Sequence, residues 1–330
     1  MSHDLIRQAA PLTMLLLASA CADATSPSLT SPYEVDPMTS AAVGTGSVLA
    51  GAALWLRADA GIGVADGAAV SVWRDQSGHQ RDAQWNAGNA FGELAPTFRS
   101  VNTPVNLRPS VRFEGQHALE VDLTFLGGSD YTIIAVNGRD RTGFANFWLA
   151  GESQTINDNL VLGYERTDLL RQSHFGNDLD AVVEDYTGTE IWSLDTYFFD
   201  QHAGRAIYHN GAPVASDASP ATILSNPGTT LGHFRAIPSF FFQGDLGDVI
   251  VFDRALTAAE RLAVETALAQ RYGFSLSIAH YVPCAGPWSS HAEYVSAHLV
   301  AVRHFVDARL LTKAQGKAAQ AAAEASACGS

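Results

Sequence analysis

The residues best suited to chemistry are two acidic side chains, Glu120 and Asp122, which are separated by one valine. Retaining glycoside hydrolases need a nucleophile and a general acid about 5–5.5 Å apart. The pattern Glu-x-Asp-x-(x)-Glu can place such acids on one face of a strand. Here Leu-Thr-Phe follows Asp122, so the last acid is absent, and neither Gly-x-Ser-x-Gly nor His-Glu-x-x-His occurs. Catalysis is therefore the less favoured interpretation, although a polysaccharide lyase that uses Tyr or His stays open.

A second group of acids lies further along the chain, in one short stretch. Its members are Asp178, Asp180, Glu184, Asp185 and Glu190. Runs of like charge are usually solvated. We therefore expect an exposed acidic loop there.

Aromatic side chains could bind a ligand by stacking. Trp85 lies in the polar stretch 84–89, so we expect its ring to be exposed and take it as the candidate ligand-binding residue. In Phe240-Phe-Phe242, strand alternation sends Phe241 to one side and its neighbours to the other. We expect those three rings to belong to the core.

Metal-binding patterns are weak. Asp75 and Asp82 form a candidate pair, with turn capping by the Asp75 carboxylate as the alternative. His291 and His298 are seven residues apart on one predicted helix, roughly 10 Å along its axis, which is too far for one metal ion. No Cys-x-x-Cys spacing supports a zinc site.

The N-terminus resembles a secretory signal that ends in a lipidation site. A weakly basic start is followed by an apolar run, too short for a bilayer span of about 20 residues. Ala18-Ser-Ala-Cys21 is similar to the lipobox of bacterial lipoproteins, except that Ala18 stands where that family prefers Leu. The resemblance implies that residues 1–21 are a signal peptide and that Cys21 is acylated. A cleaved signal with an incidental cysteine is the alternative.

A spacer follows. Residues 22–47 are rich in Ser, Thr, Pro and Ala and have no apolar periodicity, which predicts a flexible tether. In the Gram-negative sorting pattern that the lipobox resembles, an Asp after the cysteine retains a lipoprotein at the inner membrane. Ala22 stands there, so the outer membrane is favoured.

The middle of the chain predicts an antiparallel β-sandwich. Short β-prone segments alternate with turn residues, such as Asn137-Gly138 and Asn210-Gly211, and the latter is a strong hairpin signal. The expected strands are 53–57, 69–74, 110–113, 131–136, 147–150, 160–164, 190–198, 205–208, 230–232 and 247–252. Because no long helices alternate with them, a sandwich or jelly roll is favoured over a parallel α/β sheet. Thr257 and Glu260 have capping-box spacing and predict a terminal helix that ends at Gly273.

Three stretches carry a family resemblance. They are Ala53–Asp59 with Val72–Ala83, Leu107–Gly115, and Gly244–Arg261. In this order they resemble the laminin-G-like, concanavalin-A-like jelly roll of bacterial secreted proteins. The resemblance implies an all-β, antiparallel jelly-roll sandwich over residues 48–277. It does not imply one function, since that fold hosts lectins, adhesion modules, glucanases and lyases.

Asp248 is the most interesting acid of the last strand. Alternation puts it on the same face as Ile250 and Phe252, where a carboxylate needs an arginine, backbone donors or a cation. The glucanases of this fold hold a structural calcium at a similar Asp. The resemblance therefore implies Ca²⁺ as the one candidate cofactor, with an ion pair or solvation at the strand end as the alternatives.

The C-terminal part, residues 278–330, predicts a helical hairpin. Capping-box patterns, one of them at Thr312, precede two helical stretches. If Cys21 is acylated, Cys284 and Cys328 remain and can pair in an oxidising compartment. Closing a loop of roughly 45 residues would contribute about 4 kcal/mol. Two unpaired thiols are the alternative.

Charge excludes one class of partner. The chain has 34 acidic and 20 basic side chains, a net charge of −14, and no basic stripe for a nucleic-acid backbone. We expect an exported protein that contacts the membrane only through its N-terminal lipid. Its expected role is recognition of a glycan, or of an envelope or matrix protein, without catalysis. The alternative is a carbohydrate-active hydrolase or lyase.

Overall fold

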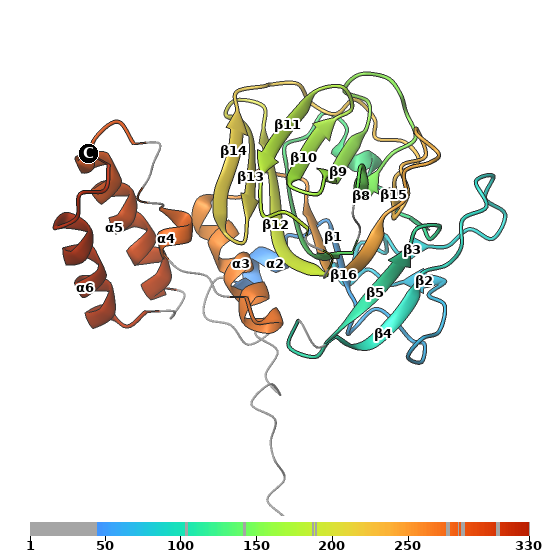
Figure 1. Ribbon diagram of the computed structural model, residues 1–330, viewed down its shortest axis with the longest axis horizontal. Coiled ribbons are helices and arrows are strands. Elements are labelled where there is room, and N and C mark those ends of the chain that lie inside the picture. The colour runs from blue at the N-terminus through green and yellow to red at the C-terminus, as the bar shows by residue number, and fades with distance from the viewer. Residues whose placement is uncertain are drawn as a thin grey trace, which may run out of the picture. The chain divides into compact units, whose positions relative to one another are not determined.

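The described part of the computed structural model is an antiparallel β-sandwich, with one short helix before it and further helices after it in the chain (Figure 1). The structure describes residues 45–102, 105–140, 143–186, 188, 190–274, 278–282, 284, 288–307 and 311–329. Within these ranges the strands form two sheets of eight strands each, sheet A and sheet B. The predicted all-β, antiparallel sandwich is confirmed.

Sheet A is built around its longest strands. Its order is β14 (Ala212–Asp217), β13 (Gly204–His209), β12 (Ile191–Asp200), β7 (Tyr131–Arg139), β16 (Gln243–Phe252), β5 (Arg108–Glu114) and β4 (Thr97–Asn102), and β1 (Leu54–Arg57) also pairs with β16. All of the described pairings are antiparallel.

Sheet B has shorter strands. Its order is β11 (Asp178–Val182), β10 (Leu169–His174), β9 (Leu160–Arg166), β8 (Asn146–Ala150), β15 (Thr230–Leu231), β6 (Leu119–Glu120), β3 (Ala83–Gln84) and β2 (Val72–Trp73). The 3-10 turn η2 (Thr124–Leu126) lies between β6 and β7 in the chain.

The main core lies between the sheets, because alternate residues of each strand point inward. Sheet A contributes Phe113, Tyr197 and Val249, and sheet B contributes Trp148 and Leu162, among many others. These side chains are almost fully buried.

A second apolar layer covers the other face of sheet A. It is formed by α2 (Thr45–Leu49) and α3 (Ala258–Tyr272), which pack on residues such as Ile250 and Phe252 (Figure 1). The predicted capping box of α3 is present, since Thr257 and Glu260 bond each other's backbone N–H groups. Gly273 ends α3 with a φ of 80°, a left-handed conformation that glycine adopts without strain.

Two turn and loop predictions have opposite outcomes. Asn210 and Gly211 join β13 to β14 with φ angles of 50° and 80°, so the predicted hairpin is confirmed. Asn137-Gly138 is not a turn but lies inside β7. A glycine is needed there because a Cβ at Gly138 would stand 2.6 Å from the Trp192 ring.

The expected acidic loop is also wrong in part. Asp178–Val182 forms β11, whose Leu179 and Ala181 point into the core. Glu190 is largely buried, 3.5 Å from Arg112, and burial raises the pKa of its carboxyl to about 8. Asp178 and Asp180 are the outward-facing residues of this strand, and counting charges along the sequence does not reveal that arrangement.

The C-terminal part contains α4 (Ile278–Tyr281), α5 (His291–Asp307) and α6 (Lys313–Glu324). Cys284 and Cys328 form the predicted disulfide, with their Cα atoms 4.7 Å apart. The capping box at Thr312 is present.

The N-terminal predictions fall mostly outside the described residues. Cys21, the signal peptide and the spacer up to residue 44 lie there, while the last three residues of the predicted spacer belong to α2. Among the described residues no helix is long and apolar enough to cross a membrane.

Candidate functional site

The outer face of sheet B carries the candidate site. The strand register aligns one outward-facing residue from each strand in a single row. The row consists of Asp178, Ser173, Val161, Ala150, Thr230, Glu120, Gln84 and Val72. The chain neighbours of these residues, such as Leu231, Leu119 and Ala83, point into the core. The row therefore faces away from the sandwich interior.

A loop of residues 232–241, between β15 and β16, lies against this face. Its ends are closed by hydrogen bonds between the backbones of Gly232 and Phe242 and of Phe234 and Phe240. The Thr230 hydroxyl donates to the His233 carbonyl oxygen, which ties the loop to the sheet. A Cβ at Gly232 would stand 2.5 Å from a Phe113 ring atom, so the close approach requires glycine.

Side chains of the loop point in two directions. Phe234 and Phe240 contact Phe147 of β8, with ring centroids 5.9 Å and 6.5 Å apart. His233 and Arg235 instead contact the Glu93 carboxylate. The loop thereby contributes to two separate pockets on the same sheet face.

The first of these, the aromatic pocket, has a volume of about 270 Å³. Its described lining is Phe144, Phe147, Val161, Glu165, Arg171, Ser173, Phe175, Gly176, Asp178, Phe234, Ile237 and Phe240. Phe144 is 54% exposed, more than any other phenylalanine that the structure describes. The pocket combines aromatic rings with a charged wall.

Arg171 organises the charged wall. Its guanidinium forms a bidentate pair with Asp180, at 2.7 Å and 2.9 Å, and also lies 2.9 Å from a Glu165 oxygen and 3.2 Å from an Asp178 oxygen. Burial and the neighbouring acids raise the pKa of Glu165, although Arg171 opposes this. Three carboxylates thus share one cation and are held as fixed hydrogen-bond acceptors.

The second pocket, the polar pocket, has a volume of about 370 Å³. Its described lining is Asp82, Gln84, Glu120, Val121, Asp122, Leu123, Thr124, Asn226, Gly228, Thr229 and Arg235. It lies at the β6–β3 part of the row, whereas the aromatic pocket lies at β8–β11.

Each carboxylate of the polar pocket already accepts hydrogen bonds. Asp82 accepts from the Asp75 N–H at 2.9 Å, and Glu120 accepts from Arg235 at 2.8 Å. Asp122 accepts from the hydroxyl and N–H of Thr124, and these bonds lower its pKa. A carboxyl with a lowered pKa is a poor general acid at neutral pH.

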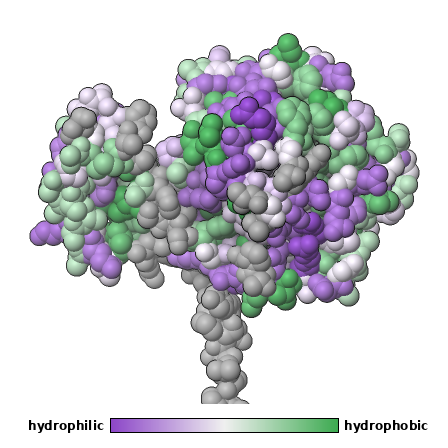
Figure 2. Space-filling model, viewed as in Figure 1, coloured by the Kyte–Doolittle hydropathy of each residue, from purple (hydrophilic) through white to green (hydrophobic). Residues whose placement is uncertain are grey.

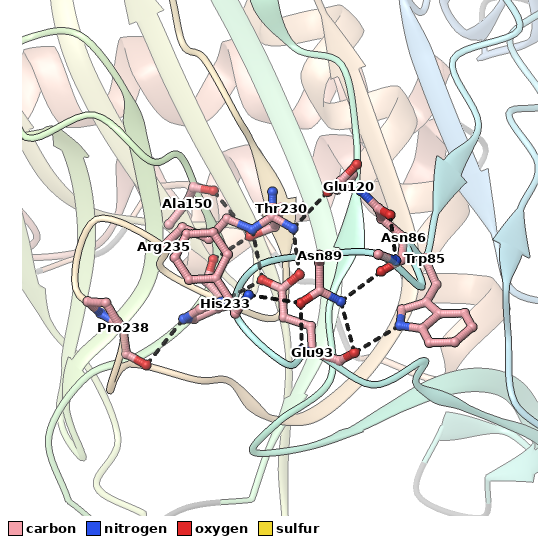
Figure 3. Close-up of polar contacts among 12 residues, drawn as sticks. Trp85, Asn86, Asn89, Glu93, Glu120, Ala150, Thr230, His233, Arg235 and Pro238 are labelled. Carbon is pink, nitrogen blue, oxygen red and sulfur yellow. Dashed lines mark hydrogen bonds and ion pairs between the residues drawn. The ribbon is translucent and has the colours of Figure 1, made fainter.

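Glu93 anchors the 232–241 loop (Figure 3). Its buried carboxylate binds Arg235 at 2.8 Å and 2.5 Å and lies 2.6 Å from the His233 ring. Burial raises the pKa of Glu93, but the bonds from Arg235 and His233 outweigh it and bring the pKa to about 2. Since Arg235 also binds Glu120, this network fixes one wall of the polar pocket.

Trp85 supports this network rather than either pocket. Its ring is partly buried against the core, and its N–H donates to the Glu93 carbonyl oxygen at 3.0 Å (Figure 3). Asn89 donates to the same oxygen. Trp85 is absent from the described lining of both pockets. Its role in ligand binding stays a prediction.

Asp75 and Asp82 are neighbours, since the Asp75 N–H donates to the Asp82 carboxylate, and a metal ion between them stays a prediction. Asp75 accepts bonds from the backbone N–H groups of Trp55, Ser77 and Arg81, which is the turn-capping alternative. Burial raises the pKa of Asp75, but these bonds lower it overall. In the described ranges no three His, Cys, Asp or Glu side chains gather around a point that could hold a metal ion.

Asp248 faces α3, on the side of Ile250 and Phe252 as predicted. Its buried carboxylate lies 3.7 Å from the Arg271 guanidinium, which supplies the positive charge that the position needs. Calcium takes six to eight oxygen ligands, and a buried guanidinium beside the carboxylate does not fit such a set. Calcium at Asp248 stays an untested prediction.

The sequence did not point to Glu93, His233, Arg235 or Arg171. Glu93 and Arg235 are 142 residues apart, so no local pattern joins them. For Arg171 the sequence contains a usable pattern. Its neighbours Leu170 and Gln172 are both buried, as expected for a strand in which Arg171 faces outward.

Comparison with known proteins gives only distant likenesses. No family model and no curated protein match the chain. The Trypanosoma rangeli sialidase in complex with sialic acid is 16% identical, with a TM-score of 0.45 over 67% of this chain and 33% of the sialidase. Domain 4 of AbnA, a GH43 extracellular arabinanase from Geobacillus stearothermophilus in complex with arabinotriose, is 15% identical, with a TM-score of 0.44 over 59% of this chain and 92% of that domain.

A third likeness is to the binding domain of Paraclostridial Mosquitocidal Protein 1. It is 16% identical, with a TM-score of 0.45 over 68% of this chain and 53% of that chain. The chain spans about a third of the sialidase that it resembles. At such TM-scores these likenesses decide nothing about the ligand.

Proposed function

We propose that the sandwich binds a glycan on the outer face of sheet B and does not cleave it. The observation that carries this proposal is the aromatic pocket, where exposed Phe144 and four other phenylalanines adjoin fixed carboxylates. Aromatic rings pack on the apolar face of a sugar, while carboxylates accept hydrogen bonds from its hydroxyls. A concave site with apolar walls and a few fixed polar groups is typical of small-ligand recognition.

Because both pockets lie on the same face of sheet B, an oligosaccharide is favoured over a monosaccharide as the ligand. From β10 to β6 the row crosses four strand spacings of about 4.8 Å, a span of roughly 19 Å. A single monosaccharide is shorter than that span. An oligosaccharide could contact the aromatic pocket and the polar pocket together.

Charge favours a neutral or amino sugar over an acidic one. The described linings of the two pockets hold five carboxylates and two guanidinium groups. The net charge of −14 adds repulsion at longer range. Polysaccharides of uronic or sialic acid should therefore bind worse than neutral ones.

The test is a glycan array and calorimetric titration with the neutral oligosaccharides that the array selects. Phe144→Ala should weaken binding about threefold to tenfold, the size of one lost aromatic contact. Val101→Ala, a 58% exposed apolar side chain on sheet A, is the matched control and should bind normally. Normal binding by Phe144→Ala, or selection of acidic glycans only, would refute the proposal.

Hydrolysis or lyase chemistry is the second candidate. It is favoured by the three carboxylates of the polar pocket, Asp82, Glu120 and Asp122. Against it, each of them is already engaged, and the pKa of Asp122 is lowered. Reducing-sugar release, or unsaturated product from a lyase, on the glycans that bind would establish catalysis.

Location and family remain proposals from the sequence. Ala18-Ser-Ala-Cys21 supports a lipid anchor at Cys21, and Ala22 after it supports the outer membrane. The three quoted stretches support a laminin-G-like identity. An envelope or matrix protein is the alternative partner. Mass spectrometry of the mature N-terminus should find an acylated Cys21, and an unmodified cysteine would refute the anchor.

A further inference from the structure

Lysine is nearly absent from this chain. Among its 20 basic side chains only two are lysines, Lys313 and Lys317, and both lie in α6. Residues 284–330 contain four basic and three acidic side chains, whereas the rest of the chain is strongly acidic. The tail is therefore the least negative part of the protein.

The two lysines are placed against the local preference of a helix. Lys313 is the first residue of α6, where the helix dipole disfavours a cation, and no acid stands in that turn. Lys317 is one turn further along the same face, where two like charges repel. In α3 the same chain follows the rule, with Glu260 in the first turn and Arg271 in the last. Residues that break a local rule without a structural gain often mark a functional site.

Arg303 of α5 lines the same groove. With the two lysines it surrounds a pocket of about 350 Å³, whose other described lining residues are Val302, Val306 and Gly316. The three cationic side chains are exposed. None of them forms an ion pair with another side chain that the structure describes, a set that does not include Asp307. On the face seen in Figure 2, the region of α5 and α6 is mostly pale, with few strongly hydrophilic residues.

The groove is preorganised by its helices. A Cβ at Gly316 would stand 2.7 Å from a Val306 methyl and 3.1 Å from a Val302 methyl, so glycine allows α5 and α6 to approach closely. Glycine inside a helix is otherwise unfavourable. The Thr312 capping box fixes the start of α6, and Cys328 after its end is tied to Cys284.

We propose that this basic groove between α5 and α6 binds a phosphate-bearing anion. Phosphate oxygens accept several charge-assisted hydrogen bonds, and lysine and arginine are their usual partners. The valine floor suits a ligand whose phosphate adjoins an apolar or carbon-rich part. A long polyanion fits poorly, because the rest of the protein would repel it. This inference is independent of the glycan proposal.

The lysines themselves provide the test. An amine-reactive label on the full chain modifies only Lys313, Lys317 and the N-terminal amine, and mass spectrometry reads each separately. The probes are inorganic phosphate and phosphatidylglycerol vesicles, compared with chloride at equal ionic strength and with zwitterionic phosphatidylcholine vesicles. We expect at least threefold slower labelling of both lysines. Protection by phosphate assigns the site to the phosphate group itself, and protection by phosphatidylglycerol alone assigns it to a lipid headgroup.

Two variants show whether the protection of the lysines depends on the groove. Arg303→Gln retains both reporter lysines and should lose most of the protection, whereas Arg166→Gln, a 56% exposed arginine of β9, should keep it. Because these side chains are exposed, melting temperatures should stay unchanged. Labelling that phosphate and phosphatidylglycerol slow no more than their controls do would overturn the proposal.

Discussion

Glu93 provides the sharpest test of how the candidate site is held together. Its carboxylate is only 2% exposed and joins Arg235 and His233 of the 232–241 loop to the rest of the domain. Glu93→Gln keeps the size of the side chain and removes the charge. It leaves the Arg235 guanidinium, which is 7% exposed, with Glu120 as its remaining acidic partner.

The expected loss of folding free energy follows from the pKa of the Glu93 carboxyl. A pKa held at about 2, rather than 4.5, corresponds to about 3 kcal/mol of folding free energy, because one pKa unit equals about 1.36 kcal/mol. A lowered carboxyl pKa gives stability that is present above pH 4.5 and is lost as the pH falls toward 2. Breaking a buried ion pair typically costs a similar 3–5 kcal/mol.

The assay is urea denaturation of the wild type and Glu93→Gln at pH 7 and pH 3. At pH 7 the variant should unfold about 3 kcal/mol more easily, and the difference should shrink markedly at pH 3. Glu114→Gln is the control, since that carboxylate is 58% exposed and should change stability by less than about 0.5 kcal/mol. An equal difference at both pH values, or no difference at pH 7, would refute this account of the network.

Three further predictions concern the sandwich. Burial lowers the pKa of His209, but the carboxylates of Asp195 and Glu184 outweigh it and raise the pKa to about 9. The stability of the fold should therefore decrease as the pH rises from 6.5 to 9. Urea denaturation of His209→Gln over this pH range should not show the decrease. Gly138→Ala should lower stability by about 1–3 kcal/mol, because its methyl would meet the Trp192 ring, and unchanged calorimetric unfolding would show that the ring moves aside. Asp248→Asn should lower the melting temperature, whereas EDTA should leave that of the wild type unchanged; a fall on chelation would instead support calcium.

Sequence reasoning found the strands that are apolar on both faces. Residues 131–136 and 247–252 were predicted as strands and lie within β7 and β16. The strands β10 and β11 were missed because their outward positions carry Arg171, Asp178 and Asp180, which resemble a solvated loop when charge alone is counted. The inward residues of β11, Leu179 and Ala181, held the signal of a half-buried strand.

The candidate site was harder to predict than the fold. Trp85 was expected to be exposed because its neighbours are polar, but the carbonyl of Glu93 accepts its N–H and the ring packs on the core. Arg235 meets Glu93 and Glu120 only because β15 pairs with β6 in sheet B. Sheet order joins residues more than 100 positions apart, and no spacing pattern in one sequence reports it.

The outer face of sheet A is covered by helices, whereas the outer face of sheet B carries two pockets. This difference decides where a ligand can bind. On sheet A, α3 and α2 bury the outward side chains of β1, β7, β12 and β16, and the Asp248 carboxylate there is neutralised by Arg271. On sheet B no described helix covers the outer face in this way, and the 232–241 loop leaves a pocket on each side of itself. Phe144 is half exposed beside one of them, although burying a large aromatic ring would stabilise the fold. An apolar ring left in water next to fixed carboxylates has a physical reason if a sugar, apolar on one face and hydroxylated at its edge, covers it.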